Sequence, residues 1–194
     1  MKHSPETLGT DAPLANENVT NAQAFGLRMG QKLEEINVKA DKGKQVYEVA
    51  PPLPHPTFDY YTATVTEKAG LCRVMGFSKI FENDAFGTNV RSEFNKIVEL
   101  LSSKYGPSKK FDYLNHNSIW NEDRYWVTAV YRNERSLSAY WQEQHNSVLP
   151  KGLKGISIFV SALNASDAYI IINYEFQNFE EYKKERDAIN NQGL

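Results

Sequence analysis

Two pairs of strand-like runs, each joined by a short turn, constrain the fold of this chain more than any other feature of its sequence. The first pair covers residues 58–66 and 70–81, and Gly70 stands at the turn between the two runs. The second pair covers residues 155–163 and 168–176, with the polar residues 164–167 between them. Runs of aromatic and β-branched residues bounded by turn residues are typical of hairpins. The sequence therefore predicts two antiparallel hairpins.

A long helix is predicted between the two hairpins. Apolar residues recur in residues 86–105 at the spacing of one helical face, and they are Phe86, Val90, Phe94, Ile97, Val98, Leu101 and Tyr105. We expect Asn83, Asp84 or Thr88 to cap its start, and Gly106 followed by Pro107 to end it.

Residues 118–145 allow two interpretations. As a helix, they place Trp126, Ala129, Val130, Leu137 and Trp141 on one face, with acidic residues at the start. As a hairpin, they form strands at 125–131 and 136–141, joined by residues 132–135. We favour the helix, because the acidic start and the apolar spacing agree.

The two ends of the chain carry shorter elements. Phe25, Leu27 and Met29 alternate as in a short strand, and Gly30 opens a short helix that carries Leu33 and Ile36. Residues 45–50 form another strand, followed by prolines at 51, 52, 54 and 56 that predict an extended connector. A capping pattern at 178–181 predicts a short terminal helix, with Tyr182 and Ile189 facing inward.

Together these elements predict an α+β fold, in which an antiparallel sheet is built from hairpins and the helices pack mainly on one face. Residues 1–24 contain no aromatic residue and no apolar period, so we expect a flexible polar tail there. The length of 194 residues suits one domain. We therefore predict a single α+β domain over residues 25–194.

Charge and composition exclude several classes of protein. The net charge is −2, from 22 basic and 24 acidic residues. Up to residue 27 the chain has one base and three acids, which leaves 21 of each in the remainder. A neutral body argues against a nucleic-acid partner, and no apolar run is long enough for a transmembrane segment. The single cysteine, Cys72, excludes an internal disulfide.

Motifs that carry chemistry are scarce. The sequence has no G-x-S-x-G, no phosphate-binding glycine loop and no histidine spacing typical of zinc sites. Cys72 lies in an apolar strand pattern, which indicates a small buried side chain. We therefore predict no catalytic residue, no cofactor and no metal, and hence no enzyme.

One enzymatic alternative remains open. A small glycan-active hydrolase would use Glu122, Asp123, His116 or His145 as its catalytic groups. Trp120 and Trp126 flank the two acids, an arrangement that would suit a carbohydrate-binding cleft. A tryptophan near a helix start is also typical of the core.

Aromatic residues are abundant, with eleven Tyr, ten Phe and three Trp. Several lie among arginines, a composition typical of protein-binding hot spots, although tyrosines and tryptophans also occupy the boundary of a core. The predicted partner-binding residues are Tyr60, Tyr61, Trp120, Arg124, Tyr125, Arg132 and Arg135. Tyr60 and Tyr61 are neighbours in a strand, so they point to opposite faces. These residues predict a non-catalytic protein-binding module, such as an inhibitor, an immunity protein or an accessory protein.

The motif F-G-L-x-x-G at residues 25–30, followed by a short polar helix, resembles the opening of SmpA/BamE-like bacterial envelope domains and of similar uncharacterised bacterial and phage proteins. The resemblance covers residues 22–50. It implies a helix on an antiparallel sheet and, as an alternative function, a periplasmic lipoprotein-like accessory domain of the envelope. The sequence departs from that pattern, because it has no lipobox cysteine and no apolar signal region. We expect a cytoplasmic protein if Met1 is the native start, and a periplasmic one if a signal sequence was removed.

Overall fold

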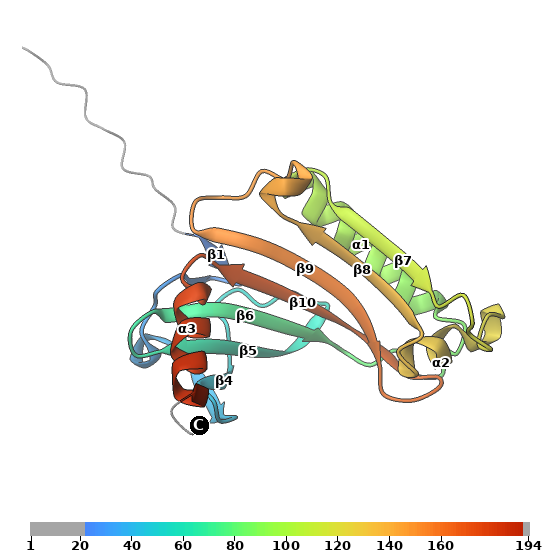
Figure 1. Ribbon diagram of the computed structural model, residues 1–194, viewed down its shortest axis with the longest axis horizontal. Helices are drawn as coiled ribbons and strands as arrows, with labels where there is room; N and C mark the ends of the chain where they lie inside the picture. The colour runs from blue at the N-terminus through green and yellow to red at the C-terminus, as the bar shows by residue number, and fades with distance from the viewer. Residues whose placement is uncertain (1–21, 192–194) are drawn as a thin grey trace, which may run out of the picture.

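The computed structural model describes residues 22–191, and within them one antiparallel sheet of eight strands dominates the fold (Figure 1). Its strands lie in the order β3-β4-β5-β6-β10-β9-β8-β7. Their bounds are β3 (Val38–Asp41), β4 (Val46–Val49), β5 (Phe58–Thr66), β6 (Gly70–Ser78), β7 (Lys109–Leu114), β8 (Arg135–Trp141), β9 (Leu153–Ala162) and β10 (Ala168–Phe176). The expected α+β class is confirmed, because the helices pack on this antiparallel sheet.

The two predicted hairpins, β5–β6 and β9–β10, form the centre of the sheet, where β6 pairs with β10. Gly70 begins β6 with a φ of 67°, and a Cβ at this position would lie 2.3 Å from the carbonyl oxygen of Gly30. The backbones of Gly30 and Gln31 both hydrogen-bond to Leu71. A glycine is therefore needed at residue 70 for this close approach of two backbones.

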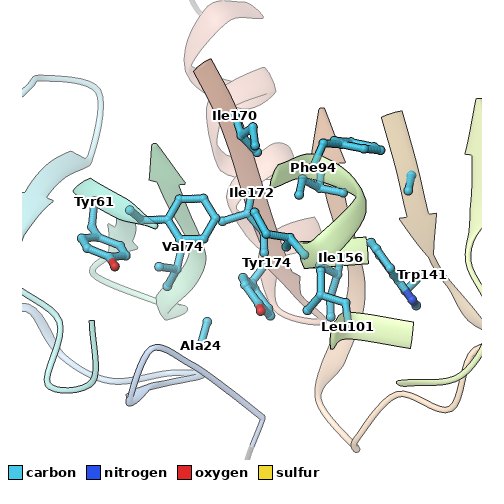
Figure 2. Packing of buried hydrophobic residues seen from close by; sticks show 14 of the residues in the cluster. Ala24, Tyr61, Val74, Phe94, Leu101, Trp141, Ile156, Ile170, Ile172 and Tyr174 are labelled. Atoms are coloured by element: carbon cyan, nitrogen blue, oxygen red, sulfur yellow. The ribbon is translucent and has the colours of Figure 1, made fainter. Parts of the chain in front are cut away.

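Two helices lie on one face of the sheet and a third lies on the other. Helix α1 (Thr88–Tyr105) packs against β9 and β10, and α2 (Trp126–Tyr131) packs against β8 and β9. Figure 2 shows Phe94 and Leu101 of α1 in this core, with Leu101 beside Ile156.

Helix α3 (Phe179–Asn191) contacts β6 on the opposite face. Lys183 of α3 pairs with Glu175 of β10, while the next residue in the strand, Tyr174, faces the core. Neighbouring residues of a strand point to opposite faces, so α3 lies on the face away from α1. Cys72 is buried beside Phe179 and Tyr182 in a small second cluster under α3. The Cys72 side chain is fully buried, which confirms the prediction of a small buried side chain, and this burial raises the pKa of the thiol to about 12.

The long helix begins two residues later than its apolar spacing predicted. Phe86 lies outside α1 and is exposed, so its placement on the helical face was wrong. Gly87 occupies the N-cap with a left-handed φ of 66° and has no side chain to cap the helix. The Asp84 carboxylate instead accepts hydrogen bonds from the backbone N–H of Asn89 and Val90, at 3.0 and 2.9 Å. Gly106 ends the helix with a φ of 78°, as expected.

Residues 118–145 are neither one long helix nor the expected hairpin. A 3₁₀ turn, η2 (Asp123–Tyr125), leads into the six residues of α2, and Asn133 with a φ of 57° ends the helical segment. The chain then returns to the sheet as β8, so the helical interpretation was wrong beyond Arg132. Strand β8 pairs with β7, which the sequence did not predict.

The N-terminal boundary also differs from the prediction. Ala22 and Ala24 are buried in the core, so the fold includes residues that were assigned to the tail. Strands β1 (Gln23–Ala24) and β2 (Leu27–Arg28) form a small separate sheet. The helix expected after Gly30 is a single 3₁₀ turn, η1 (Leu33–Glu35). Residues 1–21 lie outside the described part of the chain, as does the side chain of Ile189. None of the described helices has the length and apolar character needed to cross a bilayer.

Candidate functional site

The structure separates the two neighbouring tyrosines of the predicted binding surface. Tyr61 is buried, and its hydroxyl accepts a hydrogen bond from the His55 N–H at 2.9 Å and lies 3.2 Å from the His55 carbonyl oxygen, to which it donates. Burial also raises the pKa of this phenol above its ordinary value. Tyr61 is therefore a core residue, and its assignment to a partner-binding surface was wrong because the strand turns it inward.

Tyr60 lies on the opposite face of β5 and is half-buried. Its ring meets Phe77 edge to face, with 5.3 Å between ring centroids, and Lys42 lies over it at 5.7 Å. Three strands separate β5 from β8 in the sheet. Tyr60 is therefore remote from the predicted residues between 120 and 135.

The remaining predicted residues gather at one end of the sheet, around α2. Trp120 and Tyr125 meet edge to face with ring centroids 5.3 Å apart. The Arg124 guanidinium lies 4.8 Å from the centre of the Tyr125 ring and pairs with Glu122 at 3.0 Å. This stack holds a half-buried tryptophan and tyrosine beside an exposed arginine.

The other two predicted arginines differ in their exposure. Arg135 is mostly buried, pairs with Asp112 at 3.0 Å and lies 5.7 Å from the Trp126 ring. Arg135 therefore stabilises the junction between β7, β8 and α2 and is not available to contact a partner. Arg132 is exposed, with its guanidinium 5.5 Å from the Tyr131 ring.

Four exposed apolar residues at the same end were not predicted. The exposed fraction is 75% for Ile119, 54% for Phe86, 50% for Leu163 and 44% for Tyr131. Sequence reasoning placed Phe86 on a helical face and left Ile119, Tyr131 and Leu163 unassigned. Ile119 lies between a serine and a tryptophan, outside any apolar period, so no pattern in the sequence indicated its exposure.

Hydrogen bonds bring the segments that carry these residues together. The N–H of Val127 donates to the Ala85 carbonyl at 3.1 Å, and the Thr128 hydroxyl lies 3.3 Å from the Ala165 carbonyl. Figure 1 shows α2 and the turn between β9 and β10 at the same end of the sheet. We call this surface the α2 end, and it comprises Phe86, Ile119, Trp120, Arg124, Tyr125, Tyr131, Arg132 and Leu163.

The four candidate groups of a hydrolase do not converge. Glu122 and Asp123 are exposed at the α2 end, and Glu122 is paired with Arg124. His145 lies in η3 (Glu143–His145), beyond the opposite end of β8, while His116 is exposed in the loop after β7. Within residues 22–191, no group of three His, Cys, Asp or Glu side chains is placed to bind a metal ion.

A second feature is a pocket of about 380 Å³ between α1 and the sheet. Its walls are largely apolar, and its polar groups come from His55, Ser103, Lys104, Tyr105 and Tyr174. Tyr174 is buried, and this burial, together with the nearby Tyr105, raises the pKa of its phenol. Neither phenol hydrogen-bonds to another described residue, so both hydroxyls remain available to a bound molecule.

Comparisons with known protein families, with curated proteins and with solved structures find no match to this chain.

Proposed function

We propose that this chain is a protein-binding module, such as an inhibitor, an immunity protein or an accessory protein, and that the α2 end contacts its partner. The observation that supports this most is the exposure of Ile119, Phe86, Tyr131 and Leu163 on segments that are hydrogen-bonded to one another. Exposed apolar side chains that cluster mark interaction sites more often than scattered ones do.

The neighbouring side chains suit such a site. Binding energy at protein interfaces is concentrated in tryptophan, tyrosine and arginine, and Trp120, Tyr125 and Arg124 form one stack beside Ile119. Aromatic rings that are already held by neighbours lose little conformational freedom on binding. The stack therefore supplies contact area at a low entropic cost.

The residues beneath this surface are closely packed. Trp126, the first residue of α2, is buried with Arg91 and Arg135 at 5.2 and 5.7 Å from its ring. The backbone at Gly87 packs directly against the same indole. The α2 end is thus anchored to the start of α1 and to the sheet, as a preorganised binding surface requires.

The test is affinity capture from an extract of the source cells with two matched variants. Ile119→Asp changes the α2 end, and Val148→Asp changes a residue that is equally exposed, at 75%, near the opposite end of β8. We expect the unmodified chain and Val148→Asp to enrich the same partner protein. Ile119→Asp should weaken that complex by about 2 kcal/mol, or roughly 30-fold in affinity, as the loss of a hot-spot residue does.

Two results would contradict the proposal. One is the capture of the same partner, with equal affinity, by both variants. The other is the loss of the partner with Val148→Asp alone, which would move the binding surface to the η3 end of β8.

The pocket under α1 supports a second candidate function, the binding of a small molecule with an apolar body and one hydrogen-bond acceptor. The apolar walls would contact the body of such a molecule, and the phenols of Tyr105 and Tyr174 would donate hydrogen bonds to its acceptor. Titration with a fluorescent fatty acid measures this binding. Tyr174→Phe should weaken it several-fold, and an unchanged affinity would exclude this pocket as the binding site.

A further inference from the structure

The two edges of the eight-stranded sheet are unlike each other. Strand β3 is short, with four residues, and its register against β4 shifts between Val38 and Ala40. Strand β7 has six residues and pairs with β8 in unbroken register, from Lys109 opposite Tyr140 to Leu114 opposite Arg135. Short and irregular edges resist the addition of another strand, whereas long and regular edges accept one.

The outer side of β7 is open. Five of its six residues are exposed, among them the aromatic residues Phe111 and Tyr113. Within residues 22–191, the backbone of β7 hydrogen-bonds to β8 alone. A row of N–H and C=O groups along the outer edge therefore remains free to pair with a second strand.

The residues of β7 are complementary to a second copy of the same strand. When two copies run antiparallel about Phe111, Lys110 of each copy faces Asp112 of the other, and Lys109 faces Tyr113. Opposite charges and cation–aromatic pairs placed directly across from each other stabilise a sheet. Centring the pair on Lys110 or on Asp112 would instead set two like charges against each other.

We propose that the chain forms a symmetric dimer in which β7 pairs with β7 of a second copy, with Phe111 at the two-fold axis. The two sheets then become one continuous sheet, and the blunted β3 strands lie at its two outer edges. Such an interface uses the same surface on both copies, so it closes at two chains rather than extending into a fibre.

The contacts within one chain are compatible with this pairing. Asp112 keeps half of its side chain exposed while it pairs with Arg135. The Lys110 ammonium donates to the Asn95 side chain at 2.8 Å and is exposed. On the other face, Phe111 meets Tyr140 edge to face at 5.7 Å, so its ring is already oriented for a partner. This inference does not depend on the proposed function of the α2 end.

A charge-swap experiment tests the dimer by sedimentation velocity over a range of concentrations. We expect the unmodified chain to sediment as a dimer. In the Lys110→Asp variant, the new carboxylate of each copy faces Asp112 of the other copy. The interface then contains two pairs of like charges, which should weaken self-association roughly tenfold. Asp112→Lys should do the same, and the double variant Lys110→Asp/Asp112→Lys should restore the dimer. Thermal melting checks that each variant is folded, because Asp112→Lys also removes the pair with Arg135.

The outcomes separate this proposal from its alternatives. The proposal is overturned if the unmodified chain sediments as a monomer over the whole range of concentrations. A dimer whose affinity is the same in all four proteins also overturns it, because it places the interface elsewhere.

Oxidative cross-linking tests the register. Phe111→Cys should form a disulfide-linked dimer, because residues directly opposite each other lie close enough to be bridged. Tyr113→Cys serves as the control, since in this register residue 113 faces residue 109 rather than itself. Cys72 is buried and takes no part. A disulfide-linked dimer of the Tyr113→Cys protein would overturn the register. The register would also be overturned if the Phe111→Cys protein were dimeric but formed no disulfide.

Discussion

Gly87 is the position where the structure allows the sharpest test of how the α2 end is held. Its φ of 66° lies in the left-handed region, which costs a residue with a Cβ about 1–2 kcal/mol. A Cβ here would lie 2.3 Å from Cε3 and 2.8 Å from Cδ2 of the Trp126 indole. Trp126 is 2% exposed, so its ring has no free space to move into. Forcing a methyl group into such packing costs about 1–3 kcal/mol.

Gly87→Ala is therefore expected to lower the free energy of unfolding by about 3 kcal/mol, which is the sum of the backbone and packing costs. Gly43→Ala is the matched control, because Gly43 has a similar φ of 79° but no atom within 4 Å of the position that a methyl group would take. The control should lose only the backbone cost of about 1 kcal/mol. Urea denaturation followed by tryptophan fluorescence measures both values. Equal losses for the two variants would refute the close packing of Gly87 against Trp126.

Three further expectations follow from buried groups. The Cys72 thiol, whose pKa burial raises to about 12, should resist a disulfide reagent at neutral pH until urea unfolds the chain, and rapid labelling of the folded protein would contradict this. Asp84→Ala removes the carboxylate that caps α1 and should cost about 1 kcal/mol, so an unchanged melting temperature would count against the cap. Burial raises the pKa of the Tyr174 phenol, so above about pH 10 the unfolded chain releases this proton first and stability falls as the pH rises. Tyr174→Phe should flatten that alkaline loss in urea titrations at several pH values, and an unchanged slope would exclude Tyr174 as its source.

The elements with strong periodicity were predictable from the sequence. The aromatic and β-branched runs of β5, β6, β9 and β10 correspond to the two predicted hairpins, and the apolar face of α1 is buried from Val90 to Tyr105. These segments face the core, where burial requires one regular side-chain pattern. Strand β7 escaped prediction because an exposed edge strand has no buried face to give it an apolar pattern.

The segment 118–145 shows how helix and strand periods can be confused. Trp126, Ala129 and Val130 do share a helical face, but Leu137, Ala139 and Trp141 are the buried apolar residues at alternate positions of a strand. The helical interpretation joined the two groups across Asn133, whose left-handed backbone separates them. An asparagine followed by an alternating run was the available signal for a break.

The candidate site was predictable only in part. Aromatic and arginine residues directed attention to residues 120–135, where binding to a partner stays a prediction, yet Arg135 pairs with Asp112 within the fold and Tyr61 lies in the core. Alternation indicated that Tyr60 and Tyr61 face opposite ways, but it could not tell which of the two faces the core. Ile119 gave no composition signal, because exposure of a single apolar residue is set by the tertiary fold.

Site-specific photocross-linking tests the central claim, that the α2 end contacts a partner protein, most directly. A photoreactive amino acid is placed at Ile119 in one protein and at Val148 in another, two positions with the same exposed fraction of 75%. After irradiation in an extract of the source cells, the Ile119 position should yield one adduct of defined mass, and the Val148 position should yield none. An adduct formed from Val148 alone, or the same adduct formed equally from both positions, would contradict the account.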